Sequence, residues 1–161
     1  MKENKSWMEV NQAVTVAKPA DQLYAQWRDL ESLPTIFSHV KSVRVESPTV
    51  SHWVVEGPAG KDVEWTSRIV EDSPPFRLSW QSLQGSELDN EGTVEFVPIE
   101  GKDRRAYTEI RVKLRYHPPA GKVGQAVAAL FNRDPASQIA EDLRRFKRIT
   151  EAEDLRTGTT G

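Results

Sequence analysis

The chain has 161 residues, of which 37% are hydrophobic and 29% are charged, and its formal net charge at pH 7 is −2. This length suits one domain with a buried core, and a charge near zero gives no strong attraction to nucleic acid or to an anionic membrane. The absence of cysteine excludes disulfide bonds, thiolate metal sites and cysteine nucleophiles.

The first twelve residues show no apolar core of a secretory signal, and no stretch approaches the roughly 20 apolar residues that cross a bilayer. Together with the lack of cysteine, this predicts a cytoplasmic protein with no integral membrane association.

The N-terminal third predicts one strand and two short helices. Residues 8–16 alternate between apolar and polar side chains, which is typical of a half-buried strand. Segment 19–30 begins with a proline suited to a first helical turn and carries leucine and tryptophan at helical spacing. A second short helix is expected over 31–37, disturbed by Pro34.

Up to residue 117 the pattern predicts about six further strands. Apolar and polar side chains alternate, and prolines and glycines between the segments favour turns. Short connections of this kind imply antiparallel pairing, with one dry face and one wet face. The large residues that this parity assigns to the dry face are Trp53, Trp65, Phe76, Leu78, Trp80, Phe96 and Leu114.

The C-terminal part predicts helices. A helical pattern covers 120–131, and Asp134 and Pro135 are good first residues for a last, long helix. One apolar stripe runs along that helix through Ile139, Leu143, Phe146 and Ile149. We expect a single domain over 1–155 and a disordered tail over 156–161.

This order of elements predicts an α+β fold. An antiparallel sheet of six to seven strands should curl around the long C-terminal helix, which lies across the dry face. Because one straight helix covers a curled sheet only in part, an apolar pocket is expected between them.

The polar residues show no pattern of known chemistry. His39, His52 and His117 are far apart, so no metal site is predicted, and neither a nucleophile elbow nor a phosphate loop occurs. Alternation places carboxylates such as Glu64 and Glu95 on the wet face, where a general acid or base is not expected. We therefore predict no catalytic residue, no metal and no cofactor.

Nucleic-acid binding is disfavoured as well. A stacking platform needs aromatic and basic side chains on one surface. Here Trp53, Trp65 and Trp80 fall on the dry face, whereas arginines such as Arg68 and Arg111 fall on the wet face.

Several phrases resemble the polyketide cyclase/dehydrase and coenzyme Q-binding branch of the START-like (SRPBCC) superfamily. They are "VAKPADQLYAQWRDLESLPTIFSHVKSVRV", "SHWVVEGPAGKDVEWTSRIVEDSPPFRLSWQSL" and "LRYHPPAGKVGQAVAALF", followed by "EDLRRFK". The resemblance covers about residues 8–150. It implies the helix-grip fold and an internal cavity for lipids, polyketides or isoprenoid quinones, in a superfamily that contains carriers, sensors and a minority of enzymes.

The leading hypothesis is binding of a small hydrophobic ligand, as a carrier or sensor, between the sheet and the last helix. Two buried serines would orient the ligand in an otherwise apolar wall. The predicted lining residues are Trp53, Trp65, Ser67, Trp80, Ser82, Phe96, Leu114, Phe131 and Phe146.

Two alternatives stay open. A cyclase or dehydratase acting in the same pocket would need an ionisable group there, and strand alternation supplies none. A protein-interaction or chaperone role would use the exposed rims. The sequence names neither the ligand nor the oligomeric state.

Overall fold

The computed structural model describes residues 7–38, 40–56, 62–101, 103, 105–117 and 135–158. The strands are β1 (Met8–Val16), β2 (Val40–Val45), β3 (Val50–Glu56), β4 (Asp62–Ser73), β5 (Arg77–Ser82), β6 (Asn90–Glu100) and β7 (Ala106–Tyr116). The helices are α1 (Ala20–Arg28), the 3₁₀ helix η1 (Leu30–Thr35) and α3 (Pro135–Gly158).

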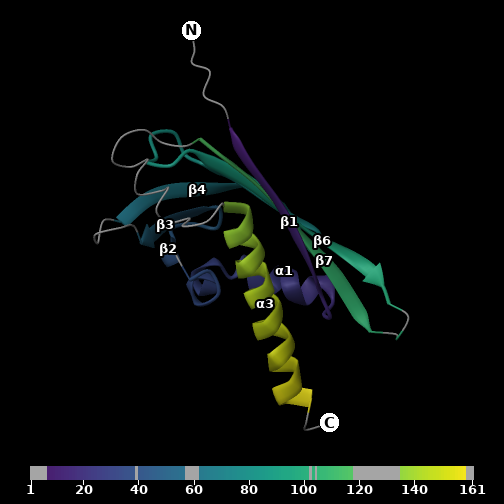
Figure 1. The fold of residues 1–161 in the computed structure, drawn as a ribbon. Helices are drawn as coiled ribbons and strands as arrows, with labels where there is room; N and C mark the ends of the chain where they lie inside the picture. The colour runs from purple at the N-terminus through teal and green to yellow at the C-terminus, as the bar shows by residue number, and fades with distance from the viewer. Residues whose placement is uncertain are drawn as a thin grey trace.

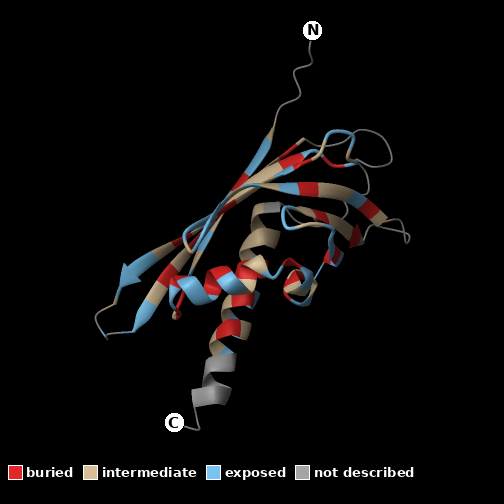
Figure 2. Cartoon of the chain, turned by 180° about the vertical axis from the view of Figure 1, so that it is seen from behind, coloured by how far each residue is buried: buried red, intermediate tan, exposed pale blue. Residues whose placement is uncertain are grey.

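The strands form one seven-stranded sheet in the order β1-β7-β6-β5-β4-β3-β2, with every neighbouring pair antiparallel. The sheet curls, and α1, η1 and α3 lie on its inner side (Figure 1). This confirms the predicted α+β arrangement of a curled antiparallel sheet around a long C-terminal helix. Figure 2 shows buried positions recurring along α1 and α3 between exposed ones.

The described helices lie where they were predicted and differ from the prediction at the end of the last helix. The predicted second short helix is present as the 3₁₀ helix η1, a geometry that suits a segment with Pro34 inside it. Helix α3 ends at Gly158, so residues 156–158 are helical where a disordered tail was predicted. The predicted helix over 120–131 lies outside the described residues.

Phe76 was predicted on the dry face and is 55% exposed instead. It precedes β5 and lies in the turn after Pro74 and Pro75, where its backbone N–H donates to the Ser73 carbonyl oxygen at 2.8 Å. The parity of a strand does not extend into a turn, so Leu78 and not Phe76 is the first buried residue of this segment.

Helix α3 is held against the edge strand β1 by two side chains. The Lys147 Nζ donates to the Thr15 carbonyl oxygen at 3.0 Å, and the Glu151 carboxylate accepts from the Ala17 backbone N–H at 2.9 Å. Lys147 and Glu151 also bind each other at 2.8 Å. These bonds use backbone groups at an otherwise open sheet edge and fix the direction in which α3 leaves the sheet.

One aromatic cluster joins α3 to α1 and the sheet. The Trp27 ring of α1 meets Phe146 of α3 at a centroid distance of 5.6 Å, Phe96 of β6 at 6.1 Å and Phe37 at 5.4 Å, all edge to face. Phe146 and Phe96 are fully buried. The stripe on α3 predicted from the sequence therefore packs inward, as expected.

Replacing Phe146 by alanine should destabilise the fold by roughly 3 to 5 kcal/mol, because it leaves a large cavity beside Trp27. Denaturant unfolding measures this free energy. The matched control is Arg148→Ala, an exposed position on the same helix, with an expected change within about 0.5 kcal/mol. Equal stability of the two variants would show that α3 does not grip the sheet.

Candidate functional site

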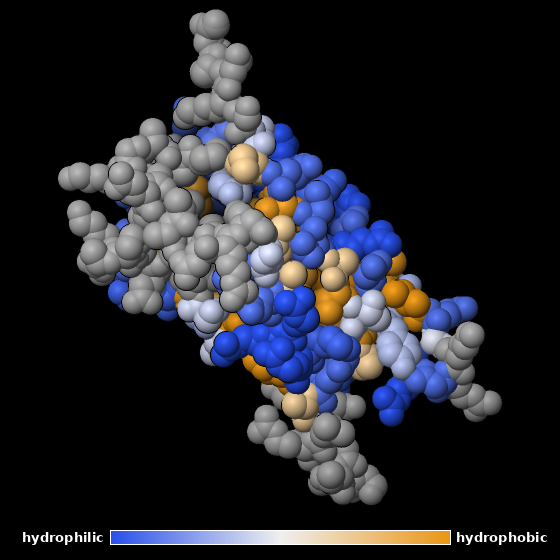
Figure 3. Space-filling model, in the orientation of Figure 1, coloured by the Kyte–Doolittle hydropathy of each residue, from blue (hydrophilic) through white to orange (hydrophobic). Residues whose placement is uncertain are grey.

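A cavity of about 170 Å³ lies between the inner face of the sheet, η1 and α3. Its wall is largely apolar, and it is partly open to solvent. An engineered protein cavity of about 150 Å³ accommodates benzene, so this space corresponds to about one aromatic ring. Figure 3 shows that α3 presents a hydrophilic outer surface, with apolar residues visible beside it.

Two stacked tryptophans form part of the wall. Trp53 of β3 and Trp65 of β4 are partners in the strand register. Their rings are parallel within 7°, with centroids 6.0 Å apart. The Trp53 Nε1–H donates to the Ser51 Oγ at 3.0 Å, which satisfies the indole and fixes its ring. The pair therefore offers a rigid aromatic surface to the cavity.

A glycine positions the third tryptophan of the sheet. Trp80 of β5 lies opposite Gly92 of β6, and its indole covers the glycine. A Cβ at Gly92 would lie 2.8 Å from the Trp80 Cη2 and 2.9 Å from the Lys113 carbonyl oxygen. Real Cβ atoms do not approach so closely, so a larger residue here would displace the Trp80 ring from its place in the wall.

A row of serines crosses the sheet beside these rings. Ser51, Ser67 and Ser82 are register partners on β3, β4 and β5, and all three are buried. The Ser82 Oγ accepts from the Asn90 backbone N–H at 3.0 Å and donates to the Asp89 carboxylate at 3.3 Å. Ser67, at the middle of the row, makes no side-chain hydrogen bond within the described part of the chain. Its hydroxyl is available to a ligand.

An acidic side chain also lines the cavity, which corrects the expectation that no ionisable group lies there. Asp142 of α3 is 3% exposed, and its Oδ1 accepts from the Gln138 Nε2 at 3.2 Å. Burial raises the pKa of this carboxyl from 3.8 to about 6. The hydrogen bond from Gln138 and the charge of Arg145 lower the pKa, and the charge of Glu141 raises it further, but desolvation dominates.

Strand alternation does not reveal Asp142, because this residue lies on a helix. Along α3, Asp142 is three residues after Ile139 and four before Phe146, which places it on the apolar stripe. Helical spacing could therefore have identified it. Tyr116 of β7, whose phenol pKa is raised by burial, is the other titratable group in the described wall.

The structure divides the predicted lining residues into groups. Five lie in the cavity wall: Trp53, Trp65, Ser67, Trp80 and Leu114. Phe96 and Phe146 are buried in the cluster around Trp27, and Ser82 is buried at the end of the serine row. Phe131 lies outside the described residues. The sequence did not single out Ser51, Asn90, Asp142 or Tyr116, which also line the cavity.

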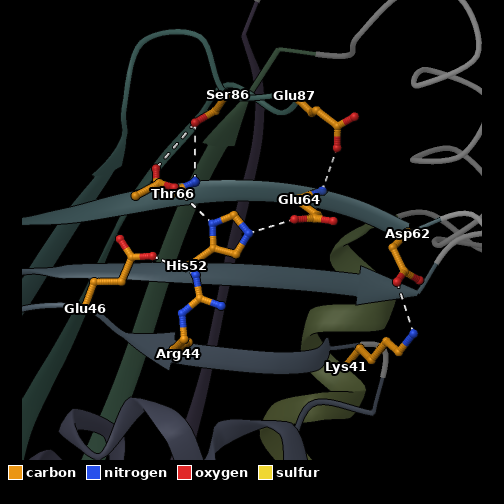
Figure 4. A network of polar contacts seen from close by, with 9 residues as sticks. All are labelled: Lys41, Arg44, Glu46, His52, Asp62, Glu64, Thr66, Ser86 and Glu87. Atoms are coloured by element: carbon orange, nitrogen blue, oxygen red, sulfur yellow. Dashed lines mark hydrogen bonds and ion pairs between the residues drawn. The ribbon is translucent and has the colours of Figure 1, made fainter.

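A second polar cluster lies on the outer face of the sheet (Figure 4). The His52 ring contacts the Thr66 Oγ1 at 3.0 Å and the Glu64 carboxylate at 2.8 Å, and Glu87 accepts from the Glu64 backbone N–H at 2.7 Å. His52 alternates with Ser51 and Trp53 along β3, so this cluster faces away from the cavity. Its bonds join β3, β4 and the segment before β6, which indicates a structural role.

Within the described ranges, no helix combines the length and the apolar character needed to cross a bilayer.

Comparison with known proteins identifies the group to which the chain is similar. The profile of the family described as "Polyketide cyclase / dehydrase and lipid transport" matches residues 16–144. An uncharacterized 17.2 kDa protein of Streptomyces lincolnensis is 27% identical over 151 residues, which cover 92% of this chain and 93% of that protein.

Two solved structures show the same fold. A crystal structure of a Deinococcus radiodurans protein is 40% identical, covers 91% of this chain and 99% of its own, and superposes with a TM-score of 0.72. A START superfamily protein from Mycobacterium smegmatis is 18% identical, covers 88% of this chain and 98% of its own, and has a TM-score of 0.65. The predicted resemblance is thereby confirmed.

The raised pKa of Asp142 predicts a pH-dependent stability. Its carboxyl binds a proton more tightly in the folded state than in the unfolded state, so the protein should lose stability as the pH rises from about 4 to about 6. Asp142→Asn should therefore raise the free energy of unfolding by roughly 2 to 3 kcal/mol above pH 7 and change it little below pH 4.

Thermal and denaturant unfolding across this pH range measure the difference. The control is Glu100→Gln, which removes an exposed carboxylate from β6. This variant should show the same dependence of unfolding free energy on pH as the native chain. If Asp142→Asn changed the free energy of unfolding by the same amount at every pH, the raised pKa of Asp142 would be contradicted.

Proposed function

The chain belongs to the polyketide cyclase/dehydrase and lipid transport family, and we propose that it binds a small hydrophobic molecule between its sheet and α3, as a carrier or sensor. The observation that carries this proposal is the cavity itself, a largely apolar space with a few polar groups at its wall. Pockets for small molecules have this composition, because apolar contacts provide affinity and isolated polar groups fix orientation.

The shape of the wall favours a planar ligand. The stacked pair Trp53 and Trp65 provides a flat surface, and Trp80 lies on the next strand along. A ring of a quinone or of a polyketide fits a space of about 170 Å³, and the opening to solvent leaves room for a tail. Among lipids, isoprenoid quinones and polyketides, this favours a ligand that carries a ring.

A second candidate function is catalysis of the cyclase or dehydratase type in the same cavity. Asp142 is the observation that favours it, because a buried carboxyl with a pKa of about 6 can accept and return a proton near neutral pH. Conversion of a bound polyketide-like probe by the native chain and not by Asp142→Asn would establish it. The protein-interaction hypothesis is less well supported, because the tryptophans of the sheet gather inside and not on the rims.

The cytoplasmic location and the absence of a metal or cofactor stay predictions from the sequence.

Hydrophobic probes should bind inside the protein, quench tryptophan fluorescence and raise the melting temperature. A ligand that binds only the folded state stabilises it by about 2.7 kcal/mol at a hundredfold excess over its dissociation constant. A panel of a fatty acid, a short-chain quinone and an aromatic polyketide tests this by thermal shift and fluorescence titration.

The matched variants are Trp65→Leu and Trp80→Leu in the wall, with Trp7→Leu as control. The Trp7 ring lies against the His117 ring, with a centroid distance of 3.7 Å and a tilt of 31°, and it does not line the cavity. Loss of a wall ring should weaken binding about tenfold, since burial of one large side chain contributes roughly 1.5 to 3 kcal/mol, and the control should bind normally. Binding in the cavity would be refuted if no probe raised the melting temperature. It would also be refuted if all three variants lost the same amount of ligand affinity.

A further inference from the structure

A glycine inside the sheet faces one tryptophan of the cavity wall. Gly92 of β6 lies between Trp80 of β5 and Leu114 of β7 in the strand register. Directly opposite residues of antiparallel strands share a face, so a side chain at position 92 would point inward, beside two residues of the wall. A glycine within a strand often marks a place where another group approaches closely, and here that group is the Trp80 ring.

The indole of Trp80 occupies the space that a side chain at Gly92 would fill. A Cβ at this position would come closest to the Trp80 Cζ2 and would lie 2.8 Å from the Cη2. Both atoms belong to the outer edge of the six-membered ring, so the ring extends sideways over the neighbouring strand β6. Because Trp80 also lines the cavity, its ring lies between the backbone of the sheet and the space for a ligand.

We propose that Trp80, held against the sheet by Gly92, sets the size of the ligand: the cavity admits one ring with a flexible tail and excludes fused ring systems. This inference rests on the proposed function, since it concerns the molecule that occupies the same cavity. Trp80 is then a specificity-determining residue, and Gly92 is a positioning residue that acts through it.

The volume of the cavity supports this limit. A space of about 170 Å³ corresponds to about one aromatic ring. A flexible tail can turn toward the opening to solvent, whereas a second fused ring is rigid and must lie in the plane of the first. Protein interiors are close-packed, so a ring system that exceeds the space forces its neighbours to move.

The neighbours of Trp80 explain why this ring determines the limit. Its register partner on β4 is Ile69, and the residue beyond Gly92 is Leu114, so aliphatic side chains flank the indole on both sides. At this level of the sheet the indole is the largest group in the wall. Replacement of Trp80 by a smaller residue therefore opens the most space, directly beside the existing cavity.

The test compares the binding of 4-butylphenol and 2-naphthol to the full chain, by isothermal titration or NMR. The two probes have the same number of carbon atoms and one hydroxyl group each, but one carries a flexible tail and the other a second fused ring. We expect the native chain to bind 4-butylphenol more tightly by about tenfold or more, since a small excess of size changes affinity by this factor in an apolar pocket.

Trp80→Leu should lower this preference at least about tenfold. The affinity for 4-butylphenol falls because contact with the ring is lost, whereas the second ring of 2-naphthol gains the vacated space. Trp80→Phe should shift the preference in the same direction by a smaller factor, and it serves if the leucine variant does not fold. The control is Phe96→Leu, which removes buried volume in the cluster around Trp27 and should keep the native preference within about twofold.

Two further variants test the role of Gly92. Gly92→Ala should weaken 4-butylphenol binding by about tenfold or more, because the new Cβ pushes the Trp80 ring into the ligand space. The same Cβ would lie 2.9 Å from the Lys113 carbonyl oxygen, so the substitution also disturbs the backbone. The double variant Gly92→Ala with Trp80→Leu separates these effects, and it should bind 4-butylphenol as tightly as Trp80→Leu alone. If the double variant bound as weakly as Gly92→Ala, the positioning role of Gly92 would be overturned.

The outcomes distinguish this inference from the proposed function. If the native chain bound 2-naphthol as tightly as 4-butylphenol, or if both Trp80 variants kept the native preference, the inference would be overturned and hydrophobic ligand binding would remain. If neither phenol and no member of the hydrophobic panel bound, the proposed function would fail together with the inference.

Discussion

The contact of α3 with the inner side of the sheet is the constraint on which the rest of the structure depends. A seven-stranded curled sheet has a larger apolar face than one helix can cover. Lys147 binds the backbone of β1 and Glu151 that of Ala17, directly after this strand. Phe146 packs on Trp27, so the position of α3 is fixed along one side. The space that remains between α3 and the sheet is the cavity, which is lined by residues of β2 to β7 and of α3.

This geometry gives similar side chains different roles. Phe96 and Phe146 meet Trp27 and stabilise the fold, whereas Trp53, Trp65 and Trp80 face the open space. Asp142 lies in that space although its burial opposes ionisation, and its replacement by asparagine should stabilise the protein. A residue that lowers stability at a cavity is a common sign of function, because binding sites tolerate strain that a core does not.

Most of the fold could be predicted from the sequence, because alternation in the strands fixes which side chains face inward. Trp53, Trp65 and Trp80 follow from parity alone. Two features could not be obtained in this way. Whether an inward aromatic fills the core or lines a cavity depends on where α3 crosses the sheet, which the stripe on α3 does not specify. Phe76 shows the limit of parity, since two prolines end the strand before it. Asp142, in contrast, was accessible from helical spacing and was overlooked.

Xenon binding tests most directly whether an apolar cavity lies between the sheet and α3, because an apolar cavity of this size binds xenon irrespective of the natural ligand. A crystal structure of the full chain under xenon pressure should show a xenon atom between the sheet and α3, in contact with Trp53, Trp65 or Leu114. If side chains filled this space and no xenon were bound in it, the protein would have no ligand cavity between the sheet and α3.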